Sequence, residues 1–129
     1  DGDASNITQY SAFSYEVLFD AANLNLTILN TVNTWGLAGT FNEWGSPDVP
    51  MTLSTEAGMD YLVATLTLDA GAEFKIRADE GWTINYGDAG AGDGTLARDG
   101  GNFSVAEAGD YEVRFYFCAQ TPYYTVTKL

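Results

Sequence analysis

The sequence predicts an all-β fold, a single antiparallel β-sandwich of the immunoglobulin or jelly-roll kind with about 8–9 strands. Apolar side chains alternate with period two along most of the chain, which is typical of half-buried strands. Turn residues separate these segments at short intervals, and no segment has a helical apolar stripe with caps. Aromatic residues make up 14% of the chain, which favours strands because aromatic side chains fit a pleated surface.

The alternating segments place each expected strand in order along the chain. They cover residues 13–19, 24–28, 35–41, 61–68, 73–78, 95–96, 102–105, 111–117 and 123–129. Residues 87–101 are rich in glycine and predict a loop around the short strand at 95–96. Trp35 begins a strand beside apolar neighbours and is expected to pack in the core or at an edge.

The first residues carry little pattern, so we expect residues 1–10 to be a linker or an N-terminal extension and residues 11–129 to be the domain. The start at Asp1-Gly2-Asp3 predicts a domain cut from a longer, multidomain precursor. No stretch approaches the length of apolar residues that a membrane-spanning helix needs.

The charge excludes several classes of partner. The chain has 18 acidic and 5 basic residues and a net charge of −13, which repels phosphate backbones and anionic lipids, whereas a neutral ligand is compatible with it. One Cys and no His leave no disulfide, no Cys/His metal site and no Ser-His triad. We expect Cys118 to pack as a small apolar group, and we expect no cofactor.

A candidate binding surface follows from the strand at 73–78. If Phe74 and Ile76 face the core, then Lys75 and Arg77 both face outward. Trp82 comes just after a turn at residues 79–81, so a large aromatic ring is presented near two cations. Arg77 either donates to a ligand or pairs with Asp79 or another carboxylate.

Trp44 lies in a loop broken by Gly45 and Pro47, and it adds a second aromatic ring to the candidate surface. Exposed tryptophans usually await a partner, because leaving them in water is unfavourable. Sugar rings offer an apolar face for stacking and a rim of hydroxyls for donors. Two tryptophan planes at an angle would fit the curved face of an α-1,4-glucan better than flat cellulose. Either tryptophan could instead be buried as packing.

Two motifs carry a resemblance to known glucan binders. Residues 39–44, GTFNEW, resemble the G-x-F-N-x-W motif of family 48 carbohydrate-binding modules, which include glycogen-binding domains. Residues 74–87, FKIRADEGWTINYG, are more similar to starch-binding domains of the SusE/SusF surface lipoproteins. The resemblance covers roughly residues 35–129, and the region before Trp35 fits only loosely.

The resemblance implies a non-catalytic domain that binds starch, glycogen or maltooligosaccharides. It assigns the sugar contacts to Trp44, Lys75, Trp82, Arg77 and Asn102, and Asn85 is a secondary candidate that could be a turn residue. It also implies an outer-membrane lipoprotein at the cell surface, with starch-uptake proteins as partners.

Three alternatives stay open at this stage. A plain spacer sandwich would bury or dispense with Trp44 and Trp82. A glycoside hydrolase needs only two carboxylates, although a small sandwich with no predicted deep cleft favours a domain that is not an enzyme. Asp88, Asp93 and Asp99 in the glycine-rich stretch could bind calcium, or they could simply form turns.

Overall fold

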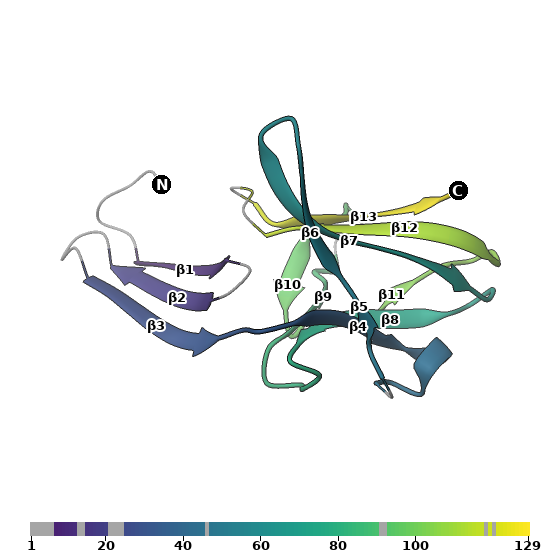
Figure 1. The fold of residues 1–129 in the computed structure, drawn as a ribbon, viewed down its shortest axis with the longest axis horizontal. Helices are drawn as coiled ribbons and strands as arrows, with labels where there is room; N and C mark the ends of the chain where they lie inside the picture. Colours follow the sequence, from purple (N-terminus) through teal and green to yellow (C-terminus); the bar gives the residue numbers. More distant parts are fainter. Residues whose placement is uncertain are drawn as a thin grey trace.

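The computed structural model describes residues 7–12, 15–20, 25–45, 47–90, 93–117, 119 and 121–129. It confirms the predicted all-β sandwich, which consists of two packed antiparallel sheets (Figure 1). The strands are β1 (Ile7–Ala12), β2 (Tyr15–Asp20), β3 (Asn25–Thr31), β4 (Trp35–Gly39), β5 (Val49–Pro50), β6 (Thr52–Glu56), β7 (Met59–Leu68), β8 (Glu73–Ala78), β9 (Asn85–Asp88), β10 (Leu96–Arg98), β11 (Phe103–Ser104), β12 (Gly109–Tyr116) and β13 (Tyr123–Lys128).

The two sheets of the sandwich have six and four strands. The six-stranded sheet has the order β10-β9-β8-β4-β5, and β11 pairs with the free part of β8. The four-stranded sheet has the order β13-β12-β7-β6. Strands far apart in the sequence are therefore neighbours, such as β4 and β8 or β7 and β12. The chain must close long loops to form this fold.

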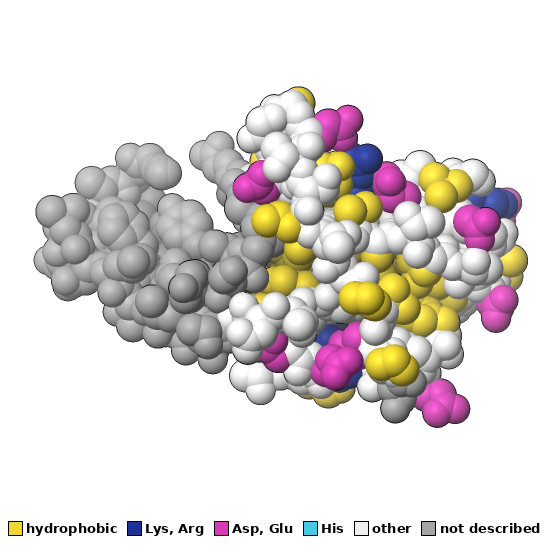
Figure 2. Space-filling model, viewed as in Figure 1, with side chains coloured by type: hydrophobic (Ala, Val, Ile, Leu, Met, Phe, Trp, Pro, Cys, Tyr) yellow, Lys and Arg dark blue, Asp and Glu magenta, His cyan; other side chains and the backbone are white. Residues whose placement is uncertain are grey.

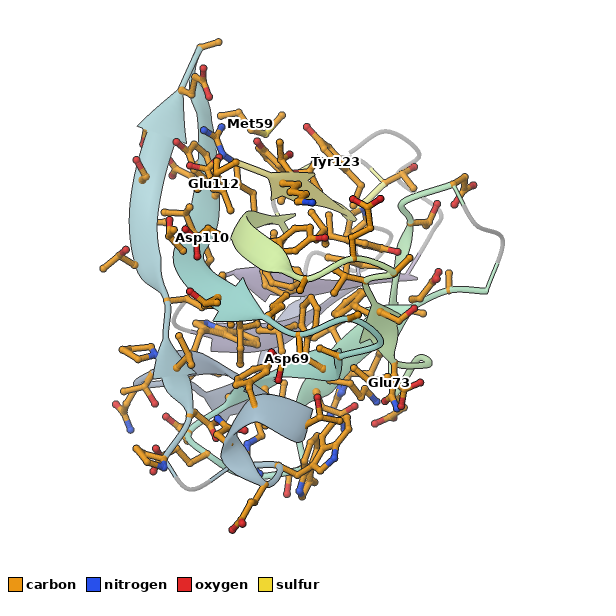
Figure 3. All side chains as sticks on the ribbon, turned by 90° about the vertical axis from the view of Figure 1, so that its right-hand side faces the viewer. Met59, Asp69, Glu73, Asp110, Glu112 and Tyr123 are labelled. Carbon is orange, nitrogen blue, oxygen red and sulfur yellow. The ribbon has the colours of Figure 1, made fainter. Side chains whose placement is uncertain are left out.

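The core lies between the two sheets and follows the alternation of the strands. In β8, Phe74 and Ile76 are fully buried, and Val113 and Phe115 of β12 meet them from the other sheet. Trp35 is 5% exposed, which confirms its predicted place in the core. Figure 3 looks onto the end of the sandwich and shows side chains filling the space between the sheets, with Asp69 in the turn that joins β7 to β8.

The N-terminal strands form a sheet of their own. β1, β2 and β3 pair in that order, and none of them pairs with a strand of the sandwich. Figure 1 shows this three-stranded sheet beside the sandwich, joined to it through the segment between β3 and β4. The expected extension at 1–10 overlaps β1, and residues 1–6 are outside the described part, so the domain boundary at residue 11 stays a prediction.

The strands differ from the expected ones in several places, since β1, β5, β6 and β9 were not expected. Most residues of β6 are exposed, so this edge strand has no apolar alternation to reveal it. The run expected at 35–41 ends at Gly39, where a 3₁₀ turn over Thr40–Asn42 begins. Several strands are only two or three residues long, which raises their number above the expected one.

The acidic side chains are spread over the face of the sandwich that Figure 2 shows. On the face in Figure 2, Asp and Glu side chains are scattered, and the few Lys and Arg side chains lie beside acidic ones. Among the described residues, no helix has the length and apolar character that crossing a membrane requires. Cys118 is outside the described residues.

Candidate functional site

The outer face of the six-stranded sheet, turned away from the four-stranded sheet, has a floor of small residues. Gly36 and Ala38 of β4 lie opposite Arg77 and Lys75 of β8. Gly87 of β9 continues the same face on the other side of β8. A Cβ built on Gly36 would lie 2.7 Å from that of Asp48, and one on Gly87 would lie 1.9 Å from a backbone oxygen. At both positions neighbouring segments take the space that a side chain would fill: Asp48 and Val49 at Gly36, and the backbone of Gly100 and Gly101 at Gly87.

The turn that carries Trp44 has an unusual backbone. Glu43 and Trp44 both have left-handed backbones, with φ of 53° and 62°, a conformation that is unfavourable for residues with a side chain. Asn42 holds the turn: its Nδ2 donates to the carbonyls of Leu37 at 3.1 Å and Pro47 at 2.8 Å, and its Oδ1 accepts from the Gly39 N–H at 2.9 Å. The Asn of the GTFNEW motif therefore builds the loop that presents Trp44.

A second strained turn carries Trp82. Asp79 and Glu80 are left-handed, with φ of 53° and 55°. Asp79 Oδ1 accepts hydrogen bonds at 2.9 Å from the backbone N–H groups of Asn33 and Thr34, which ties the turn to the start of β4. Strained backbones concentrate at functional sites, where the surrounding structure holds them. Both turns lie on the outer side of the six-stranded sheet (Figure 1).

The two turns bring Trp44 and Trp82 together. Their ring centroids are 6.2 Å apart, and their planes are tilted by 47°. Trp82 is 44% exposed, and Trp44 is half-buried. The rings thus form a tilted aromatic pair that is open to solvent on one side. We call the group formed by Trp44, Lys75, Arg77 and Trp82 the Trp44–Trp82 surface.

Arg77 faces outward as the alternation predicts, but it is only 4% exposed. Its Nε and Nη2 donate to Oδ2 and Oδ1 of Asp48, both at 2.7 Å. Its guanidinium carbon lies 4.6 Å from the ring centroid of Trp82. These hydrogen bonds to Asp48 raise the pKa of Arg77. The carboxylate that pairs with Arg77 is Asp48 rather than Asp79.

Lys75 is half-buried and lies on the same face of β8 as Arg77, whose guanidinium contacts Trp82. Burial lowers the pKa of its ammonium, and the negative charge of Asp99 offsets part of this effect. Within the described part of the chain, Lys75 makes no hydrogen bond or ion pair. An ammonium with free donors and reduced hydration can bind a hydroxyl group without first breaking a salt bridge.

The two asparagines of the predicted site have different surroundings. Asn85 is 6% exposed, and its Nδ2 donates to the Trp82 carbonyl at 2.8 Å and to Asp99 Oδ1 at 3.0 Å. Asn85 begins β9 rather than forming a turn itself. Its side chain braces the preceding Trp82 turn and is buried. Asn102 is exposed and donates to Glu73 Oε1 at 3.3 Å. It precedes β11, where Phe103 pairs with Phe74, so the register places it beside Lys75.

The aspartates of the glycine-rich stretch serve as turn formers. Asp88 accepts from the Gly90 N–H at 2.9 Å, and Asp93 accepts from the Thr95 N–H at 3.0 Å. Hydrogen bonds from Thr95 lower the pKa of Asp93. Among the described residues, no three acidic, Cys or His side chains are grouped as a metal site would require.

Sequence reasoning missed three residues that shape the site: Asn42, Asp48 and Asp99. Asn42 lies inside a motif whose tryptophan alone drew attention. Asp48 precedes β5 and lies 29 residues from Arg77 of β8 along the chain, so no local pattern reveals it. Asp99 was considered only for calcium, whereas it accepts from Asn85 and acts on the charge of Lys75. The available signal was the scarcity of basic residues, only 5 in the chain. In so acidic a chain, acidic neighbours such as Asp48 and Asp99 are to be expected beside Arg77 and Lys75.

Comparison with known proteins adds no relative to these observations. No family model matches the chain, and no curated protein or solved structure matches it.

Proposed function

We propose that this chain is a non-catalytic domain that binds α-1,4-glucan on the Trp44–Trp82 surface. The observation that carries the proposal is the tilted pair of indole rings on the sheet face that also presents Lys75, whose ammonium makes no hydrogen bond or ion pair with the described residues. Apolar faces of sugar rings stack on indole, and Lys75 donates to hydroxyls along their rim. Asn102 lies beside Lys75 and supplies a further donor.

The tilt of 47° between the two rings supports a curved ligand. An α-1,4-glucan turns along its length, so neighbouring glucosyl units present their faces at an angle. A flat chain such as cellulose would touch one ring and leave the other. The overall charge of −13 also favours a neutral polysaccharide over an acidic one.

The open shape of the site supports modest affinity. A shallow surface leaves much of the ligand in water, and binding must order a flexible chain, so we expect dissociation constants in the micromolar to millimolar range, about −4 to −8 kcal/mol. Several such domains in one longer protein would raise the overall affinity by linkage. The outer-membrane location, the lipid anchor and the starch-uptake partners enter the proposal from the sequence resemblance.

The arrangement of the carboxylates supports binding without hydrolysis. A glycosidase needs two carboxylates free to act on one glycosidic bond. Asp48, the acid deepest in this surface, has both oxygens bound to Arg77. Asp99 is also engaged, because it accepts from Asn85. Incubation with maltoheptaose should therefore release no shorter sugar, and measurable release would overturn this part of the proposal.

Affinity electrophoresis tests the proposal directly. Gels cast with amylopectin or glycogen should retard the protein, whereas gels with cellulose or no polysaccharide should not. Trp44→Ala and Trp82→Ala should each remove the retardation. Tyr123→Ala is the matched control, because Tyr123 stacks on Tyr116 of the four-stranded sheet with ring centroids 4.4 Å apart.

Two outcomes would contradict the proposal. Unretarded migration of the parent protein in both α-glucan gels would refute α-glucan binding. If both tryptophan variants fold and are retarded like the parent, the ligand binds elsewhere. In the first case the aromatic pair would be packing in a spacer domain, which is the remaining alternative function.

A further inference from the structure

We propose that Arg77 is a positioning residue that sets the tilt between Trp44 and Trp82, and that it does not itself contact the ligand. The part of this inference that concerns ring geometry stands on its own, whereas its consequence for glucan affinity rests on the proposed function. Three observations carry it: the burial of Arg77, its contacts with both turns, and the fit of the backbone around its guanidinium.

Burial removes Arg77 from direct contact with a ligand. The residue is 4% exposed although it lies on the outer face of the sheet. Two of its donors are held by Asp48, whose side chain is equally buried. A sugar hydroxyl would have to displace a bidentate, charge-assisted pair in order to bind this guanidinium, and such pairs are among the stronger hydrogen bonds in proteins.

Contacts with both turns give Arg77 its positioning role. The guanidinium carbon lies 4.6 Å from the centroid of the Trp82 ring, within the range of a cation–π interaction. On the other side, Nη2 is 3.5 Å from the Gly45 carbonyl, and Gly45 directly follows Trp44 in the chain. One planar group therefore touches the ring of one tryptophan and the backbone next to the other.

The backbone near Arg77 is fitted to the guanidinium. A Cβ on Gly45 would lie 1.8 Å from Nη2 of Arg77. A Cβ on Gly36, which faces Arg77 across β4 and β8, would lie 2.7 Å from the Cβ of Asp48. Two glycines thus leave room for the Arg77–Asp48 pair on the outer face. Asp48 accepts two hydrogen bonds from Arg77 and so fixes the orientation of the guanidinium plane. Asp48 therefore takes part in positioning the two rings.

The tilt can be measured without a ligand. Two nearby indoles with non-parallel transition dipoles produce a paired positive and negative band in the far-ultraviolet circular dichroism spectrum, and the amplitude depends on their separation and angle. The relevant signal is defined as the part of the spectrum that both Trp44→Phe and Trp82→Phe remove. If neither variant changes the spectrum, the rings are not coupled and the inference is overturned.

Arg77→Met is the main test, because it removes the charge and the hydrogen-bond donors of the guanidinium while keeping an unbranched side chain. We expect the paired bands to lose most of their amplitude and amylopectin retardation to correspond to about tenfold weaker binding, the size of one partly desolvated cation–π contact. Unchanged bands in a folded variant would overturn the positioning role. If Arg77→Met does not fold, Arg77→Lys decides by the same readout, since an ammonium cannot span both Asp48 oxygens and the Gly45 carbonyl.

The matched control is Arg114→Met on the other sheet. Arg114 also lies over an aromatic ring, 4.4 Å from the centroid of Tyr61, and it pairs with Glu56 and Glu112. Glu112 lies on the four-stranded sheet, well away from Glu73 at the start of β8 (Figure 3). The control should leave the tryptophan bands unchanged. If wild-type protein shows the bands but binds no glucan, the proposed function fails while the positioning role stands.

Discussion

Gly45 and Arg77 fit so closely that a Cβ atom built on Gly45 would lie 1.8 Å from Nη2 of Arg77. The far end of an arginine usually moves aside for a new methyl group. Here Asp48 holds the guanidinium through two bonds of 2.7 Å, so it cannot move without breaking a buried ion pair. Gly45 also has a φ of 121°, which disfavours any side chain.

Gly45→Ala should therefore lower the free energy of unfolding by roughly 3 kcal/mol or more, because backbone strain adds to the clash. Gly58→Ala is the matched control, since Gly58 has a φ of 79° but nothing within 4 Å of its built Cβ. It should cost only the backbone term of about 1–2 kcal/mol. Urea unfolding of both variants measures the difference. Equal losses would show that the fit to Arg77 has no energetic weight.

Asp48→Asn should lower the free energy of unfolding by about 3–5 kcal/mol, because it leaves Arg77 buried with an incomplete partner. The corresponding change on the surface is Glu56→Gln, which weakens the pair with Arg114, where the carboxylate is 64% exposed. Exposed pairs contribute about 0–1 kcal/mol. Thermal and urea unfolding should rank the two variants far apart, and a loss below about 1 kcal/mol at Asp48 would contradict a buried pair.

Glucan binding should weaken in alkaline solution through Lys75. Burial lowers the pKa of its ammonium from 10.5, so the proton is lost as the pH rises through a value below that of an exposed lysine. The charged donor is then gone, and the dissociation constant rises. Calorimetric titration with maltoheptaose between about pH 7 and about pH 10 would show this. Lys75→Met should bind more weakly and lose this dependence on pH.

Loss of the Lys75 proton should raise the free energy of unfolding, although it weakens glucan binding. Because the folded state holds the Lys75 proton less tightly than the unfolded state does, stability from this group rises with pH between the lowered pKa and 10.5. The free energy of unfolding is measured against pH for the parent and for Lys75→Met. The difference between the two slopes gives the contribution of Lys75. An alkaline loss of both binding and stability that is equal in parent and variant would exclude Lys75 as its source.

Asn42→Ala should lower the free energy of unfolding by about 1–3 kcal/mol, because it removes three hydrogen bonds and leaves backbone groups of the Trp44 turn without partners. It should also weaken retardation in amylopectin gels by loosening Trp44. Asn102→Ala is the comparison, since Asn102 is exposed and makes one long bond. It should leave stability within about 0.5 kcal/mol and affect only binding. A destabilised Asn102 variant with full binding would reverse these roles.

The alternation of β7, β8 and β12 was enough to predict the sandwich and its core. Phe74 and Ile76 are buried and Lys75 and Arg77 face outward because side chains of a strand alternate between two faces. β6 escaped prediction because both of its faces are largely exposed. Strands near β2 and β3 were expected, at residues 13–19 and 24–28, whereas β1 falls mostly within the expected extension. Alternation shows which residues form a strand but not which sheet the strand joins.

The sequence predicted which residues form the candidate site but not how deeply each of them is buried. Trp44 and Trp82 were placed in loops, and their approach to 6.2 Å follows from two left-handed turns that no periodicity reveals. The outward face of Arg77 was predicted, but its burial depends on Asp48 and Trp82 covering it from other segments. Sequence patterns report the direction in which a side chain points, whereas exposure depends on what the rest of the chain lays over it.

Gly36, Ala38 and Gly87 have small side chains or none, so other segments can approach the backbone of the six-stranded sheet closely on its outer face. Ala38 is fully buried even though it faces outward, so the residues above it rest almost directly on the backbone of the sheet. A larger residue at Gly36 would clash with Asp48, and a larger one at Gly87 would clash with the backbone of Gly100 and Gly101, so either change would shift segments that pack on this face. Under the proposed function, preference among glycans would therefore depend also on residues that never touch a sugar, and a search for aromatic and charged motifs would not detect such a change.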